Sequence, residues 1–86
     1  MTFAEAFGER LLVARFNHGR ISQEACAERA GIHRTQMTLY ETGRRMPLLE
    51  TFVRLAGALD QGPADLLGPI RWYPGAPGSF YLGEDA

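Results

Sequence analysis

Apolar residues recur three or four positions apart near the start of the chain, the spacing of one face of an α-helix. The first such series runs from Phe3 to Ala14. Thr2 and Glu5 have the spacing of a capping box, in which the N-cap and the third helical residue cap one another. Gly19 is the kind of residue that follows a helix C-terminus. The pattern therefore predicts a first helix from about residue 3 to residue 18.

Glycine, proline and capping residues divide the next fifty positions into four shorter helices. Ser22 is a suitable N-cap for QEACAERA, which Gly31 ends, and HRTQMTLYETG closes on a second glycine. Pro63 begins a last turn, ADLL, that ends at Gly68. The segment between them, LLETFVRLAGALD, carries one apolar stripe: Leu49, Phe52, Val53, Ala56 and Leu59. The pattern predicts an all-α, five-helix bundle over residues 1–68.

The composition changes sharply where the last predicted helix ends. Nine of the fifteen glycine and proline residues lie between positions 62 and 83. Two aromatic patches, residues 70–73 and 80–82, flank a Pro-Gly-Ala-Pro-Gly turn. Residues 69–86 are therefore expected to form a separate C-terminal tail, either a short β-hairpin or a folded-back arm.

The overall composition excludes several classes of protein. With 45% hydrophobic and 22% charged residues, the chain resembles an ordinary globular domain. No apolar run approaches the ~18 residues of a membrane span, and Glu5 and Glu9 interrupt any signal-peptide core. The single cysteine, Cys26, excludes an internal disulfide and, with two histidines, gives no metal-ligand cluster. We expect a cytoplasmic protein without membrane contact, metal or cofactor.

The charge distribution is more informative than the net charge of −1. Residues 15–54 contain seven arginines and four glutamates, whereas the two flanks together carry a charge of −4. A basic middle segment within an acidic frame indicates a surface suited to an anionic partner such as nucleic acid.

Two short helices joined by a glycine-containing turn have the geometry of a helix-turn-helix, whose second helix enters the DNA major groove. Ala27 is small enough for close helix approach, and Gly31 accommodates the positive φ of a sharp turn. The unit buries its apolar residues, namely Cys26, Ala30, Ile32, Met37 and Tyr40. The residues left facing outward on the second helix, about 33–42, are His33, Arg34, Thr35, Thr38 and Leu39.

Five sequence blocks, in order, resemble the XRE family of phage-repressor and Cro-type helix-turn-helix proteins. FGERLLVAR resembles the first helix of the family, and SQEACAERAGI matches its Ser-Gln-Glu-x-x-Ala-x-x-x-Gly-Ile pattern. LYETGRRMP matches its Tyr-Glu-x-Gly-x-Arg-x-Pro pattern; the Leu-rich helix follows, and ADLLG resembles the last helix. The resemblance covers roughly residues 6–68.

The resemblance implies a role for each of several positions. Gln23 aligns with a residue that contacts a DNA phosphate and buttresses the recognition helix. Arg44 and Arg45 lie in the loop close to the phosphates, and Arg15 and Glu41 align with a buried ion pair. The base-facing positions of the recognition helix correspond here to His33, Arg34, Thr35 and Leu39.

Each of these assignments has a structural alternative. Arg44 and Arg45 are also compatible with a solvated loop, and Arg34 with an outward arginine whose stem lies on apolar surface. Leu39 contacts either a thymine methyl group or a neighbouring side chain, and His33 is a polar helix-start residue rather than a pH switch. The tail aromatics either cover the bundle or form a dimer contact: Trp72, Tyr73, Phe80 and Tyr81.

Two functions remain open at this stage. The first is a sequence-specific double-stranded DNA-binding transcriptional regulator, a homodimeric repressor whose phosphate contacts position it and whose base contacts specify the site. The second is an antitoxin-like or regulator-binding module that engages another protein through its tail. The bundle shows no spare apolar face, so the tail is expected to build the homodimer. An enzyme is the third class and is not expected, because the chain has no paired carboxylates in a cleft-forming context, no nucleophile motif and no phosphate-binding glycine loop.

Overall fold

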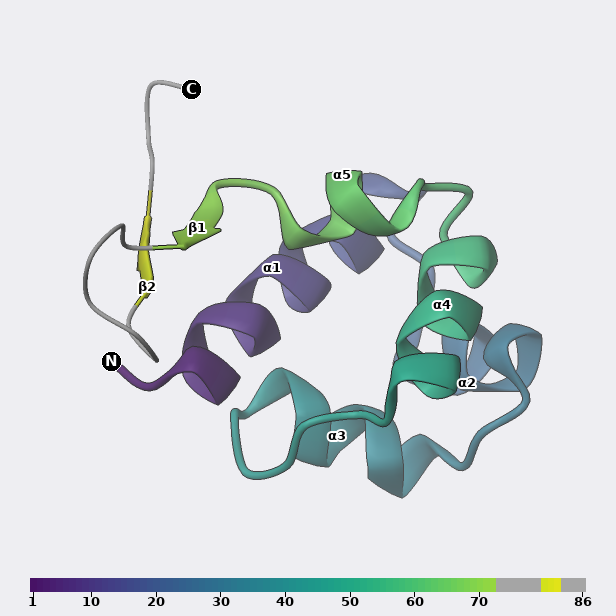
Figure 1. The fold of residues 1–86 in the computed structure, drawn as a ribbon. Helices are drawn as coiled ribbons and strands as arrows, with labels where there is room; N and C mark the ends of the chain where they lie inside the picture. Colours follow the sequence, from purple (N-terminus) through teal and green to yellow (C-terminus); the bar gives the residue numbers. More distant parts are fainter. Residues whose placement is uncertain (73–79, 83–86) are drawn as a thin grey trace.

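A computed structural model describes residues 1–72 and 80–82, with Trp72 and the last segment described by their backbone alone. Five helices are followed by two short strands (Figure 1). The elements are α1 (Phe3–Asn17), α2 (Gln23–Ala30), α3 (Arg34–Glu41), α4 (Leu49–Ala58), α5 (Pro63–Leu67), β1 (Ile70–Trp72) and β2 (Phe80–Leu82). The prediction of an all-α, five-helix bundle is confirmed.

Local capping explains why the first two helices begin where they do. The Thr2 N–H donates to the Glu5 carboxylate over 2.8 Å, and the Glu5 N–H donates to the Thr2 hydroxyl over 3.1 Å. This exchange satisfies two backbone donors that a helix start leaves unpaired. It also lowers the pKa of Glu5, because hydrogen bonds from Thr2 favour the charged carboxylate. At α2, the Ser22 hydroxyl accepts from the Ala25 N–H over 3.0 Å.

The core lies where α1, α3, α4 and α5 converge. Phe7 and Leu11 of α1, Met37 of α3, Leu55 of α4 and Leu66 of α5 are all fully buried. The bundle is closed by contacts of α1 with α3 and α5, and of α2 with α3 and α4. Burial of large apolar side chains is therefore what fixes α2 and α3 on a rigid scaffold.

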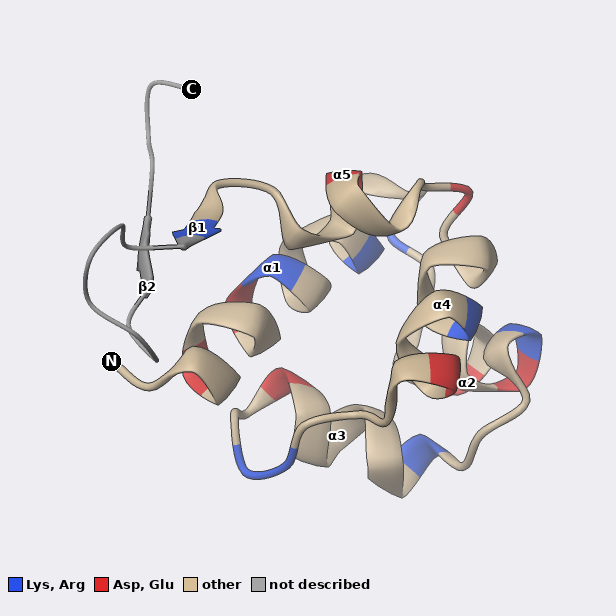
Figure 2. Cartoon of the chain, in the orientation of Figure 1, with Lys and Arg blue, Asp and Glu red and all other residues tan. Residues whose placement is uncertain are grey.

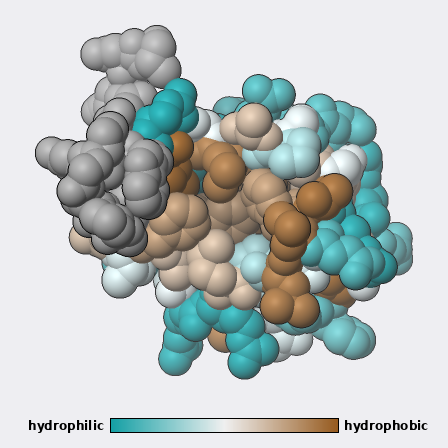
Figure 3. Space-filling view, viewed as in Figure 1, coloured by the Kyte–Doolittle hydropathy of each residue, from teal (hydrophilic) through white to brown (hydrophobic). Residues whose placement is uncertain are grey.

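The apolar stripe predicted for α4 is only partly a core face. Ala56 and Leu59 are buried, and the Phe52 ring meets Phe7 edge-on at a centroid distance of 5.7 Å. Leu49, however, is 77% exposed and Val53 is 47% exposed. The expectation that the bundle has no spare apolar face is therefore wrong, and a hydrophobic strip remains visible in Figure 3. The stripe is wider than the surface that the other helices cover.

The tail begins as an antiparallel strand pair. Ile70 pairs with Leu82, Arg71 with Tyr81 and Trp72 with Phe80. The side chain of Ile70 is 9% exposed and joins the core cluster. Tyr73 lies outside the described residues, as do the side chains of Trp72, Phe80 and Tyr81. The dimer contact assigned to these four aromatics stays a prediction.

Two negative findings apply to the described residues. None of their helices is long and apolar enough to cross a membrane. Within the same residues, no group of three or more His, Cys, Asp or Glu side chains is arranged to hold a metal ion.

Candidate nucleic-acid interface

The helix-turn-helix consists of α2, a tight turn at Gly31, and α3. Gly31 has a φ of +74°, a conformation that glycine adopts without the steric cost other residues meet. The turn is closed by the Ile32 N–H, which donates to the Ala27 carbonyl over 2.9 Å. Ala27 is 2% exposed, so its small side chain lies within the helix contact. The sequence signals at both positions correspond to this geometry.

The start of α3 is held by the side chain of its own third residue. The Gln36 carboxamide oxygen accepts from the His33 N–H over 3.0 Å, and its nitrogen lies 3.5 Å from the Tyr40 hydroxyl. Gln36 is thereby engaged within the helix. The three residues at the helix start, His33, Arg34 and Thr35, are exposed. They form the free end of the candidate recognition helix.

Thr38 and Leu39, also expected to face outward, are less exposed than the three residues at the helix start. Both are half-buried, and the Thr38 hydroxyl donates to the Gln23 carboxamide oxygen over 3.1 Å. The Gln23 nitrogen in turn donates to the Glu41 carboxylate over 2.9 Å. Because a carboxylate only accepts hydrogen bonds, Glu41 fixes which end of the Gln23 amide faces it. The Thr38 hydroxyl thus forms a hydrogen bond within the protein, which joins α3 to Gln23, the first residue of α2.

Gln23 keeps one N–H after these two contacts are made. A carboxamide has two donors and one carbonyl oxygen, and Glu41 uses only one of the donors. The orientation of the side chain is set from both sides, by Thr38 and by Glu41. A half-buried amide at a helix start with one spare donor is a suitable group for binding a phosphate oxygen.

Arg15 and Glu41 form a two-point ion pair between α1 and the last residue of α3. The two contacts are Nε to Oε2 over 2.6 Å and an Nη to Oε1 over 3.0 Å. The other Nη of Arg15 donates to the Ile21 carbonyl over 2.9 Å. The side chains are 13% and 4% exposed, and the contact with Glu41 raises the pKa of Arg15. The pair fixes the end of α3 against the scaffold.

Most of the nine arginines contact other groups of their own chain. Six of them make a hydrogen bond, an ion pair or a ring contact with described residues, namely Arg10, Arg15, Arg20, Arg29, Arg54 and Arg71. Within the part of the chain that the structure describes, the other three guanidinium groups have no such partner. These are Arg34, at the start of α3, and Arg44 and Arg45, in the loop after it, all of them exposed (Figure 2).

Gly8 is a structural residue of this site that the sequence interpretation missed. A Cβ atom at Gly8 would lie 2.6 Å from the Tyr40 carbonyl oxygen and 2.7 Å from that of Glu41. The bare backbone of α1 therefore lets the C-terminal end of α3 approach closely enough for the Arg15–Glu41 pair to form. The available signal was a glycine in the middle of a helical pattern, which often marks a close packing contact.

Cys26 is part of the core beneath this surface. It is fully buried, and burial raises the pKa of its thiol. The neutral thiol is a small apolar filler rather than a nucleophile.

Comparisons with known proteins identify the family. The model of the family described as "Helix-turn-helix domain" matches residues 6–67. The restriction-modification controller protein C.AhdI from Aeromonas hydrophila is 36% identical, with a TM-score of 0.70, over 73% of this chain and 94% of its own. The DNA-binding domain of the P22 C2 repressor is 30% identical, with a TM-score of 0.64, over 71% and 79% of the two chains.

A third solved structure, the clp gene regulator ClgR from Corynebacterium glutamicum, is 25% identical. Its TM-score is 0.74, over 78% of this chain and 85% of its own. A search of curated protein sequences finds no match. The family match spans the bundle from α1 to α5, and the three structures share its helix-turn-helix. The chain belongs to the helix-turn-helix domain family, and within it to the XRE type.

Proposed function

We propose that this protein is a sequence-specific double-stranded DNA-binding transcriptional regulator and that α3 is its recognition helix. The observation that carries the proposal is the set of three exposed arginines without a partner in the described structure. All three lie at the start of α3 or in the loop after it, where a groove-bound helix meets bases and phosphates. A solvated surface without a function does not explain why these three arginines lie there without partners, whereas the other six contact groups of their own chain.

The residues divide into two groups by their position. Arg34, at the start of α3, reads a guanine through its forked guanidinium, with His33, Thr35 and Leu39 beside it on the base-facing side. Arg44 and Arg45 bind phosphates from the loop, and the spare N–H of Gln23 binds a phosphate at the start of α2. Thr38 orients Gln23 and has no direct contact with a base.

Similar proteins support a repressor role. One solved structure holds the P22 c2 repressor in complex with a synthetic operator; that protein is 27% identical, with a TM-score of 0.65, over 72% of this chain and 92% of its own. A single recognition helix reads few base pairs, whereas a two-fold homodimer reads two half-sites one DNA turn apart. We therefore infer a homodimer that binds a palindromic site and represses by occupying it.

Selection of bound duplexes from a random pool tests the proposal directly. The expected result is enrichment of a palindrome whose half-sites lie about 10 base pairs apart, centre to centre. A matched selection with Arg34→Ala should lose one or two conserved positions in each half-site. Recovery of no motif, from a folded protein at low salt, would contradict the proposal.

The alternative function, an antitoxin-like or regulator-binding module acting through the tail, depends on aromatic side chains outside the described structure. It does not account for the three arginines, at the start of α3 and in the loop after it, that have no partner among the described residues. A protein partner of the tail is compatible with DNA binding, and the duplex selection separates the two because a pure interaction module enriches no sequence.

A further inference from the structure

Two of the helices end in turns of the same form. Gly31, after α2, and Gly43, after α3, each have a φ of +74°. Ile32 and Arg44, which follow them, donate their N–H groups to carbonyl oxygens five positions back, over 2.9 Å in each case. Such bonds satisfy carbonyl groups that a helix end leaves unpaired. The two turns are alike in their own backbone, so a difference between their surroundings points to a difference in role.

The turn at Gly43 lies against α1, whereas the turn at Gly31 has open surroundings. Among the described residues, a Cβ atom at Gly31 would meet the end of the Arg54 side chain alone, at 3.5 Å. A Cβ atom at Gly43 would lie 2.7 Å from both the Cα and the Cγ of Glu5. Figure 1 shows the first turn of α1 beside the loop that follows α3. The bare backbone of Gly43 thus packs directly on the first turn of α1.

Glu5 is itself held in place by the capping box at the start of α1. Its carboxylate accepts from the Thr2 N–H over 2.8 Å, and its own N–H donates to the Thr2 hydroxyl over 3.1 Å. These two bonds fix both the backbone and the side chain of Glu5, and atoms of both contact Gly43. Three residues further along α1, Gly8 contacts the end of α3 just as closely. Residues three apart lie on the same side of a helix, so one side of α1 supports both the end of α3 and the turn after it.

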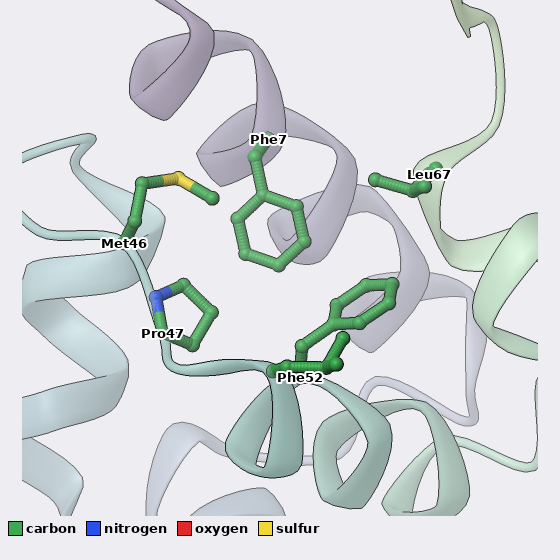
Figure 4. A pocket seen from close by; sticks show the side chains of 6 residues that line it. Phe7, Met46, Pro47, Phe52 and Leu67 are labelled. Atoms are coloured by element: carbon green, nitrogen blue, oxygen red, sulfur yellow. The ribbon is translucent and has the colours of Figure 1, made fainter.

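The loop is anchored on α1 a second time, where it leads into α4. Met46 and Pro47 share with Phe7 of α1 the lining of an apolar hollow of about 250 Å³ (Figure 4). The ring of Pro47 also fixes its φ, which restricts the chain at this point. Arg44 and Arg45 are the two residues between this anchor and the first, and both are exposed. The backbone that carries them is therefore held at both ends by the same helix.

We propose that Glu5 is a positioning residue for Arg44 and Arg45, and that the capped first turn of α1 holds their loop in the conformation that binds DNA phosphates. The inference rests on the proposed function, in which these two arginines bind phosphates. A loop that is ordered before binding loses less conformational entropy when it meets the duplex. Loss of the capping box should therefore weaken DNA binding, although neither Thr2 nor Glu5 contacts the DNA.

The sign of the expected effect separates positioning from a simple effect of charge. Glu5 is exposed and negatively charged, so its carboxylate repels a DNA backbone bound nearby. Removal of this charge alone would strengthen binding, whereas removal of the support for the loop weakens it. Glu9, which is exposed one turn further along α1, offers the matched control for charge.

The first test measures the support of the loop without DNA, by amide hydrogen exchange of the full chain. In Thr2→Ala, the Arg44 N–H should exchange several-fold faster than in the parent, because its turn loses the contact with a fixed Glu5. The Ile32 N–H, in the matching turn after α2, should keep its parent rate. Thr2→Ser retains a hydroxyl acceptor and should restore the parent rate at Arg44. An equal change at both amides, or at neither, would overturn the proposal.

The second test is the DNA affinity of Glu5→Ala and Thr2→Ala, titrated well below the melting temperature of each variant. Both should bind roughly 3- to 10-fold more weakly than the parent, the cost of ordering the loop on binding. The loss should be the same on selected and random duplexes, because every sequence offers phosphates. Glu9→Ala should bind at least as tightly as the parent. Parent affinity in Glu5→Ala, or an equal loss in Glu9→Ala, would contradict a positioning role of Glu5.

A double-mutant cycle identifies the groups that Glu5 positions. In a variant that combines Arg44→Ala with Arg45→Ala, the further change Glu5→Ala should alter DNA affinity by less than about twofold. A loss as large as in the parent background would show that Glu5 acts on another group and would overturn the proposal.

Failure of this inference and failure of the proposed function give different results. A parent that binds no duplex would refute both the proposed function and the role of Glu5 in it, whatever the exchange rates are. Normal DNA binding that depends on Arg44 and Arg45, together with parent exchange rates in Thr2→Ala, would refute the positioning role alone.

Discussion

The Gln23 side chain of α2 receives a hydrogen bond from Thr38 of α3 over 3.1 Å, and this contact links the two helices of the helix-turn-helix directly. Gln23 in turn donates a hydrogen bond to the Glu41 carboxylate, and Glu41 forms an ion pair with Arg15 of α1. A chain of polar contacts thus runs from the surface of α3 into the scaffold. Networks of this kind orient their members more strictly than isolated hydrogen bonds do.

Removing the Thr38 hydroxyl should weaken DNA binding without loosening the fold. Thr38→Val keeps the shape of the side chain and leaves the Gln23 oxygen without its donor, at a cost in stability of about 1 kcal/mol. Affinity should fall alike for all sequences, because the partner proposed for Gln23 is a phosphate, which every sequence offers. The salt dependence should stay unchanged, because glutamine carries no charge. Titrations at several salt concentrations check this.

The control for this prediction is Thr42→Val. The Thr42 hydroxyl donates to the Thr38 carbonyl within the same stretch of chain and does not reach Gln23. DNA affinity should therefore remain at the parent level. A change in sequence preference, rather than in overall affinity, on Thr38→Val would show that Thr38 contacts a base.

Loss of Glu41 should destabilise the fold strongly. Glu41→Ala leaves the half-buried Arg15 guanidinium without its counter-charge, which typically costs about 3–5 kcal/mol for a buried pair. The matched control is Glu50→Ala, which breaks the exposed pair with Arg54 and should cost roughly 0.3–0.5 kcal/mol. Denaturant unfolding of both variants, at a concentration where the parent is monomeric, gives the comparison. Equal losses would contradict a structural role of the Arg15–Glu41 pair.

The arginine at the start of α3 and the two in the following loop, which have no partner among the described residues, should behave differently on substitution. Arg34→Ala should cost about 1–3 kcal/mol on the preferred site and relax specificity at one or two base positions. Arg44→Ala or Arg45→Ala should weaken binding to every duplex and reduce the salt slope by about 1. The measurement is a set of binding isotherms on specific and random duplexes. Equal loss on both duplexes for Arg34→Ala would move this residue to the phosphate-binding group.

Gly8 should not tolerate even one methyl group. Alanine has the higher helix propensity, but its Cβ would meet backbone oxygen atoms of Tyr40 and Glu41 that have no side-chain freedom to move. Gly8→Ala should therefore destabilise the protein by roughly 1–3 kcal/mol. Gly57→Ala, in a helix position with nothing within 4 Å of the new Cβ, should instead stabilise it by about 0.5–1 kcal/mol. Thermal melts of the two variants test the difference in sign.

The Thr2–Glu5 capping box should make stability depend on pH in the acid range. The pKa of Glu5 is lower in the folded protein than in the unfolded chain, so ionised Glu5 stabilises the fold at neutral pH. This contribution is complete above the unfolded pKa and is lost as pH falls through the folded pKa. Glu5→Gln should be less stable than the parent at neutral pH, and the difference should vanish in acid. A constant difference across the titration would refute the assignment.

Much of the fold follows from short-range sequence signals. The caps at Thr2 and Ser22 and the turn at Gly31 involve residues three to five positions apart, so their energetics are contained in the local sequence. The resemblance to the family predicts the Arg15–Glu41 pair as well, because it aligns the two residues with a buried ion pair. Local signals thus determined the helix order and the helix-turn-helix.

The tertiary structure alone decided which surfaces are covered and which donors are used. Periodicity shows that Leu49 and Val53 belong to an apolar face of α4, but not whether another helix covers that face. Thr38 looks outward on a helical wheel, yet its hydroxyl finds Gln23 because α2 lies beside it. Gly8 is critical only because the end of α3 arrives there from thirty-odd residues away. Such contacts depend on how the helices pack, and packing is a property of the whole chain rather than of any local segment.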